Sequence, residues 1–142
     1  RLYFDTIACV APIGIFLGRI ANFINGELYG TPTEKPWGVI FTKIDNVPRH
    51  PSQIYEAVLE GVLLFAILNL LIGKKNFNHG VISLLFLVLY GILRIISEQF
   101  RQPDEHMGYI FGYLSMGSVL SAVMIILGML FLARFIFNEK NR

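Results

Sequence analysis

Long apolar runs alternate with shorter polar stretches along the chain, and these runs are the right length for membrane-spanning helices. A helix that crosses a bilayer needs roughly 20 mostly apolar residues. Four such stretches occur, at residues 5–24, 54–72, 81–100 and 109–137. The pattern predicts an all-α integral membrane protein with about four transmembrane helices, read as a single membrane domain over residues 1–142.

The polar stretch at residues 25–53 separates the first two spans and is rich in turn signals. It contains Asn25-Gly26 and several X-Pro pairs, and the extended segment 37–41 lies inside it. Trp37 and Tyr29 suit the membrane–water interface, where aromatic rings are enriched. We expect an extramembrane arm with short extended segments at the interface; a plain connecting loop is the alternative.

Composition agrees with the membrane class. Only 15% of the residues are charged, against about 25% in a soluble domain. The net charge of +2 is too small to indicate nucleic-acid binding. The single Cys9 excludes an internal disulfide and a cysteine metal site, and its apolar neighbours predict a small buried packing residue.

Small residues and basic residues predict how the spans pack and point. Close helix packing is expected at small residues, namely Gly14, Gly18, Gly108, Gly112, Gly117 and Ser121. If the spans alternate, one side of the membrane receives most basic ends: Arg1, Lys74, Lys75, Arg134, Lys140 and Arg142. The positive-inside rule makes that side cytoplasmic, so the arm and the loop at 101–107 face outward.

Ionisable residues within three spans fall at one depth. Arg19 comes 14 residues after Asp5, Glu60 comes 12 before Ile72, and Arg94 comes 13 after Val81. At 1.5 Å per residue, each lies roughly 20 Å above the inner boundary. Asn22, Glu56 and Glu98 lie above that level. The pattern indicates a polar cavity open to the outside, because charges in a bilayer usually face the protein interior and pair or bind something.

The third span places three polar residues on one helix face. Tyr90, Arg94 and Glu98 are spaced by four, and Arg101 follows. Two guanidinium groups near the outer leaflet suit an anionic lipid head group, since arginine binds phosphate bidentately and stays charged. The alternative is that Arg94 with Glu98, or Arg19 with Glu60, form buried ion pairs that only tie helices together.

Several sequence blocks resemble the prolipoprotein diacylglyceryl transferases of bacteria. The longest is GRIANFINGELYG at 18–30, and the others are RHPSQIYEA at 49–57, Tyr90-Gly91 with Arg94, Glu98 and Arg101, and Ser-Met-Gly at 115–117. The blocks occur in order and cover nearly the whole chain. Family members are longer and carry a His-Gly-Gly segment that this chain lacks, so the resemblance implies the C-terminal portion of such an enzyme.

The resemblance implies a transferase of the bacterial cytoplasmic membrane with no metal and no cofactor. It moves diacylglyceryl from phosphatidylglycerol to the lipobox cysteine thiol of a preprolipoprotein and releases glycerol-1-phosphate. Catalytic roles fall on Arg19, Tyr90, Arg94 and Glu98. Phosphatidylglycerol binding falls on Arg19, Asn22, Glu27, Gly30, His50, Glu56, Glu60, Arg94 and Arg101. Gly30 is expected to let the arm backbone pass close to the lipid. The base is either the absent histidine or a carboxylate of this chain.

Two readings from other classes stay open. An anion-conducting subunit would need polar residues through the full membrane depth, whereas the inner halves of the last three spans are Leu, Ile, Val and Phe. A noncatalytic phospholipid-binding fragment would bind lipid without transferring it.

Overall fold

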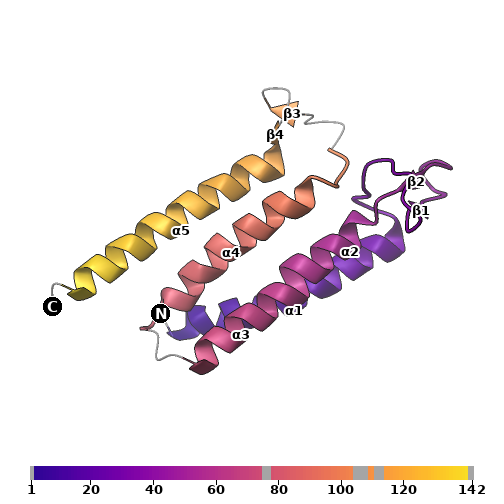
Figure 1. Cartoon of the computed structure of the whole chain (residues 1–142). Coiled ribbons are helices and arrows are strands. Elements are labelled where there is room, and N and C mark those ends of the chain that lie inside the picture. The colour runs from indigo at the N-terminus through magenta and orange to yellow at the C-terminus, as the bar shows by residue number, and fades with distance from the viewer. Residues whose placement is uncertain (1, 75–77, 104–108, 111–113, 141–142) are drawn as a thin grey trace.

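Long helices dominate the computed structural model, which describes residues 2–74, 78–103, 109–110 and 114–140. The first helix is α1 (Leu2–Asn25). The second rod runs without interruption through α2 (Ser52–Glu56), the π-helical turns η1 (Ala57–Leu63) and α3 (Leu64–Lys74). It is followed by α4 (Val81–Glu98) and α5 (Met116–Lys140), and the rods lie side by side in Figure 1. Four stretches are long and apolar enough to cross a membrane: Tyr3–Asn25, Ser52–Ile72, Val81–Glu98 and Met116–Asn138. The predicted all-α membrane class is confirmed.

The arm between α1 and α2 is ordered and contains the expected extended segments. Strand β1 (Val39–Ile40) pairs antiparallel with β2 (Pro48–Arg49), with Val39 opposite Arg49. Isolated bridges join Pro32 to Arg49 and Gly30 to Arg101. The second bridge fixes the arm to the end of α4, so the arm and that helix end lie together (Figure 1).

The last two helices differ from the sequence expectation in their bounds, and α5 also continues to Lys140 rather than ending at 137. Helix α4 ends at Glu98 rather than residue 100, because the Phe100 carbonyl accepts the Thr31 amide of the arm at 3.0 Å. Helix α5 begins at Met116 rather than 109. Residues Tyr109–Ile110 form strand β3, which pairs with β4 (Leu114–Ser115), and aromatic and β-branched residues favour strands.

A hydroxyl marks where α5 begins. Ser115 lies at the N-cap position, and its Oγ accepts the Ser118 amide at 3.1 Å. Such a side chain accepts a hydrogen bond from one of the amides that a helix start leaves unpaired, and this typically stabilises the helix by about 1 kcal/mol. The cap explains why the helix starts here although the apolar run is longer.

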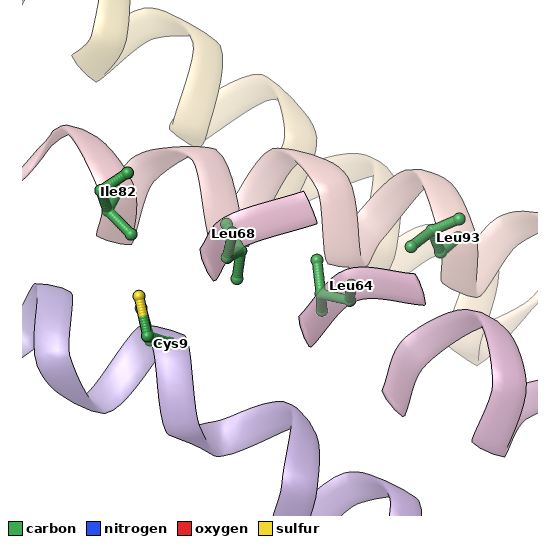
Figure 2. Close-up of a cluster of buried hydrophobic side chains, with 6 residues drawn as sticks. Cys9, Leu64, Leu68, Ile82 and Leu93 are labelled. Atoms are coloured by element: carbon green, nitrogen blue, oxygen red, sulfur yellow. The ribbon is translucent and has the colours of Figure 1, made fainter. Parts of the chain in front are cut away.

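The apolar core lies where α1, α3 and α4 meet. Cys9, Leu64, Leu68, Ile82 and Leu93 are buried there (Figure 2). Cys9 is a free thiol among them, as its apolar neighbours predicted. Since this layer is built from aliphatic side chains, it gives no polar path for an anion, which argues against the channel reading.

The helices pack closely at Gly91 and Gly128, which were not among the small residues expected at helix contacts. Gly14 and Gly18 have open space where a Cβ would lie, and Gly108 and Gly112 fall outside the described residues. A Cβ at Gly91 would instead meet Ile125 Cγ1 at 2.7 Å and the Ser121 carbonyl oxygen at 2.9 Å, and one at Gly128 would meet Val88 at 2.7 Å. The expectation is therefore wrong for the α1 glycines. Four-residue spacing of small residues does not reveal which helix face has a neighbour.

A buried carboxylate fixes the start of α4 to α1. Asp5 is 4% exposed, and its oxygens accept the Gly80 amide at 2.6 Å, the Ser83 amide at 2.8 Å and the Ser83 hydroxyl at 2.6 Å. An anion at a helix N-terminus satisfies unpaired amides and opposes the helix dipole. This contact sets the register of the two helices, and hence the relative height of the ionisable residues farther along them.

Candidate functional site

Two arginines and three glutamates from three helical rods meet in one cluster. Arg94 of α4 lies against Glu56 (Nη1 to Oε1, 2.5 Å), Glu60 (Nη1 to Oε1, 3.3 Å) and Glu98 (Nη2 to Oε2, 2.7 Å). Arg19 of α1 reaches Glu56 Oε2 with Nε at 3.1 Å and Glu60 Oε2 with Nη2 at 3.4 Å. The predicted common depth of Arg19, Glu60 and Arg94 is therefore confirmed by direct contact.

The two arginines differ in how firmly they are held. The Arg94 side chain is 9% exposed and contacts all three carboxylates. The Arg19 side chain is 16% exposed, and both of its contacts are longer than 3 Å. Nη1 of Arg19 takes no part in the ion pairs described. Arg94 thus organises the carboxylates, whereas Arg19 is the guanidinium more open to another anion.

The charges of the cluster do not cancel. With all five groups ionised, three carboxylates face two guanidiniums and leave one surplus negative charge. Glu56 and Glu60 are fully buried. An unbalanced charge in such surroundings is costly, so it draws in a proton or a further cation. A cluster whose only role is to hold the helices together would be expected to balance its charges.

The π-helical turns of the second rod carry Glu60 and the close contact with α1. A π-helix is rare and often occurs at functional sites. Gly61 lies in η1, and a Cβ there would meet Phe16 Cβ at 2.7 Å. The missing side chain lets the second rod approach α1 closely, which brings Glu60 within reach of Arg19. Ser97 of α4 donates its hydroxyl proton to Glu60 Oε1 at 2.7 Å and fixes this carboxylate from the other side.

The first turn of α5 closes the cluster beside Glu98. A Cβ at Gly117 would lie 2.9 Å from Glu98 Oε1 and 3.1 Å from Oε2, so the carboxylate occupies the space of the absent side chain. The positive end of the α5 dipole, which begins at Met116, favours an anion in this place. The Ser-Met-Gly block therefore positions Glu98, which in turn holds Arg94.

The arm is joined to the end of α4 through its own backbone. The Gly30 amide donates to the His50 carbonyl at 3.1 Å, and a Cβ on Gly30 would overlap that oxygen and lie 2.7 Å from the Phe100 carbonyl oxygen. That Gly30 lets the arm backbone pass close to a lipid stays a prediction. Gly30 makes room for protein backbone where the arm joins α4.

Two side chains at the start of α2 secure the segment that follows α1. Gln53 Nε2 donates to the Glu27 carbonyl at 2.6 Å, and Ser52 Oγ donates to the Leu28 carbonyl at 3.1 Å. Leu28 has a φ of 54°, a conformation that a leucine rarely adopts and that these bonds help to hold. The blocks at 18–30 and 49–57 thus form one unit.

The remaining predicted residues differ in their burial and contacts. Asn22 is half-buried at the end of α1, and the Glu27 side chain is exposed. Arg101 is half-buried in the bridge to Gly30. The Tyr90 ring stacks on Phe86 with centroids 5.7 Å apart and packs against the apolar core beside the cluster.

Sequence reasoning missed Ser97, Gly117 and Gln53 as positioning residues. Gly117 and Gln53 stand inside the recognised blocks, so block membership was a signal, but their contacts lie far away along the chain. Ser97 directly precedes Glu98 and follows Arg94 by three residues, and a hydroxyl between two charged residues was the available clue.

Comparisons with known proteins agree on one family. A family model described as prolipoprotein diacylglyceryl transferase matches residues 2–134. Relatives named phosphatidylglycerol–prolipoprotein diacylglyceryl transferase include those of Zymomonas mobilis (51% identical, over 88% of this chain and 45% of the relative) and Desulfotalea psychrophila (52%, over 88% and 48%). That of Wolbachia pipientis from Culex pipiens is 48% identical, over 96% of this chain and 54% of the relative. The chain spans about half the length of the curated relatives it matches.

Proposed function

Because this chain belongs to the prolipoprotein diacylglyceryl transferase family, we propose that it carries the phosphate-handling part of that transfer. The donor is phosphatidylglycerol, and the acceptor is the lipobox cysteine thiol of a preprolipoprotein. The observation that carries the proposal is the buried cluster of two arginines and three glutamates, with one arginine incompletely engaged.

The transfer forms one bond and breaks one. The thiol sulfur attacks the glycerol carbon that bears the phosphate, the carbon–oxygen bond breaks, and glycerol-1-phosphate leaves with the bonding electrons. A thiol reacts as its thiolate, so its proton passes to a base. The leaving phosphate gains negative charge, which positioned guanidinium groups stabilise.

Arg19 is the residue that meets the phosphate in this proposal. Its long contacts with Glu56 and Glu60 are the easiest in the cluster to exchange for phosphate oxygens, and its planar fork suits bidentate binding. Arg94 stays with its three carboxylates and keeps the site assembled. Glu98 holds Arg94, and Tyr90, Asn22, Glu27, His50 and Arg101 surround the head group.

Glu60 is the candidate for the thiol proton. Its Oε2 contact with Arg19, at 3.4 Å, is the longest ion pair of the cluster. When a phosphate takes the Arg19 fork, this long contact opens and leaves Glu60 Oε2 free to accept the thiol proton. The thiol of the acceptor supplies that proton as it becomes the nucleophile.

The reaction belongs, in this proposal, at the outer face of the bacterial cytoplasmic membrane. Helix α3 ends at Lys74, and α5 carries Arg134 in its last two turns. These two helix ends lie at one end of the bundle and the arm lies at the other (Figure 1). The positive-inside rule assigns the arm to the outside. Several basic residues behind this orientation, Arg1, Lys75 and Arg142, lie outside the described part of the chain, as does most of the loop at 101–107.

Transfer of labelled diacylglyceryl from phosphatidylglycerol to a lipobox peptide tests the proposal. The chain is assayed alone and together with the portion of the Zymomonas mobilis relative that it does not cover. We expect transfer in the combined sample and a loss of about 100-fold in Arg19→Lys, because a point charge cannot replace the fork. Arg134→Lys, the same change on an exposed arginine of α5, is the matched control.

Each outcome decides between the two surviving readings. Transfer that Arg19→Lys abolishes and Arg134→Lys preserves supports the proposal. Equal transfer in both variants removes Arg19 from the phosphate site. No transfer from well-inserted, combined protein favours the noncatalytic lipid-binding reading.

A further inference from the structure

A cavity of about 490 Å³ lies apart from the charged cluster, between the arm and the arm-side ends of α2, η1 and α4. Its size is in the range of small-molecule sites. None of the five charged residues of the cluster lines it. The lining residues are Lys35, Trp37, His50, Ile54, Tyr55, Val58, Leu59 and Phe100.

Three polar side-chain atoms of the cavity wall are paired with one another. Trp37 Nε1 donates to Tyr55 Oη at 2.8 Å, and Tyr55 Oη lies 3.1 Å from His50 Nδ1. The Phe100 ring packs edge-on against both Tyr55 and His50, with centroids 5.3 Å apart in each case. The wall therefore presents mainly carbon despite its tryptophan, tyrosine and histidine. A cavity of this kind favours an apolar occupant over water.

The cavity lies where the spans emerge from the bilayer. Ile54 and Tyr55 open the span Ser52–Ile72, and Phe100 follows the end of the span Val81–Glu98. Trp37 and Tyr55 are residue types that mark the interface. At this level of the bilayer, the part of a lipid acyl chain nearest the head group can enter the cavity.

Charge selects the kind of lipid. Among the eight described residues that line the cavity, Lys35 is the only one with a permanent charge, and it is exposed. A lysine beside an apolar cavity at the membrane surface favours a negatively charged head group. We propose that this cavity binds one acyl chain of an anionic phospholipid whose phosphate lies at Lys35.

This lipid position is separate from chemistry at the cluster. It rests on the proposed function only in that phosphatidylglycerol is used as the anionic lipid of the test. The test of this lipid position measures binding and not transfer. A chain that fails to transfer diacylglyceryl could therefore still bind lipid in the cavity, and a chain that does not bind lipid there could still give transfer.

Trp37 makes the test direct, since it is the only tryptophan of the chain and it lines the cavity. The chain is placed in phosphatidylcholine vesicles that contain a minor fraction of acyl-brominated phosphatidylglycerol, or the same fraction of brominated phosphatidylcholine. Bromine quenches tryptophan only at close range. We expect a preference of about fivefold for phosphatidylglycerol in the quenching titration, the size expected for one lysine near a membrane surface. Equal quenching by the two lipids would overturn the proposal.

Two matched pairs of variants locate the bound lipid. Val58→Phe partly fills the cavity, whereas Val62→Phe makes the same change one turn along, at a similarly exposed valine that does not line it. Lys35→Gln removes the charge, whereas Lys43→Gln removes an exposed arm lysine outside the cavity. We expect the excess quenching to fall to the phosphatidylcholine level in the first member of each pair and to persist in the second.

The variants also contain the results that would refute the site. Excess quenching that survives both Val58→Phe and Lys35→Gln would place the lipid elsewhere on the arm. A loss in Lys43→Gln as large as in Lys35→Gln would show attraction to the arm as a whole and overturn the specific site. If Val58→Phe misfolds, the lysine pair still decides the question.

Discussion

Replacing Arg94 with methionine should destabilise the protein more than any other single change in the charged cluster. The variant keeps most of the side-chain volume but removes the guanidinium that contacts Glu56, Glu60 and Glu98. Glu56 and Glu60 would then keep only Arg19, and Glu98 would lose the ion pair described for it. Breaking a buried ion pair by removing one partner typically costs about 3–5 kcal/mol, and we expect a loss of about that size.

The measurement is reversible unfolding in mixed micelles, followed by circular dichroism, with two comparison variants. Arg19→Met should cost less than Arg94→Met, because Arg19 has two longer contacts and is more exposed. Arg134→Met, on the exposed side of α5, should stay within about 0.5 kcal/mol of the unaltered chain.

A double variant separates charge from packing. Adding Glu56→Gln to Arg94→Met removes one of the stranded charges and should recover about 1–3 kcal/mol, the usual coupling between groups in contact. The reasoning would be refuted if Arg94→Met cost less than about 1 kcal/mol, or if the second change made the protein still less stable. Either result would mean that the carboxylates are not ionised around Arg94.

Three further changes probe the contacts that position the cluster and the arm. Gly117→Ala should displace the Glu98 carboxylate and cost about 1–3 kcal/mol in the same unfolding assay, since overpacking is destabilising, whereas Gly14→Ala, in open space, should be nearly neutral. Asp5→Asn should weaken the junction with α4 by about 1–3 kcal/mol, because the amide replaces a buried charged acceptor of three hydrogen bonds. The hydrogen bond from Arg49 lowers the pKa of Asp45, so the pair contributes its full stabilisation of the arm at a pH above the ordinary aspartate pKa. This stabilisation is lost as the pH falls through the lowered pKa. Trp37 emission should report that acid transition, and Asp45→Asn should abolish it.

The spans and the depth of the ionisable residues could be predicted because both follow from local rules. Hydrophobic run length fixes where a helix can cross a bilayer, and the rise per residue fixes height along it. The arm was also predictable, because turn residues and aromatic residues report their surroundings directly. These arguments use only residues that are neighbours in sequence.

Contacts between distant segments were beyond such rules. The start of α5 depends on the β3–β4 pairing and the Ser115 cap, which compete with an uninterrupted apolar run. Apolar periodicity does not distinguish π-helical from α-helical turns, so η1 was not foreseen. The pairing of Gly30 with His50 depends on how the arm folds back, and the sequence around Gly30 carries no sign of it.

Glu60→Gln offers the most direct test of why the cluster holds one carboxylate more than its arginines neutralise. The glutamine can still accept from Ser97, and the change removes the surplus charge, so stability should change by less than about 1 kcal/mol. Transfer should nevertheless fall by about 100- to 10,000-fold, because an amide cannot take the thiol proton. Transfer by the combined protein and unfolding of the chain should be measured on the same variant. Retained transfer would assign the proton to another group, whereas joint loss of transfer and stability would give Glu60 a structural role. Only stability without transfer fits a site in which phosphate binding at Arg19 prepares Glu60 to receive the proton.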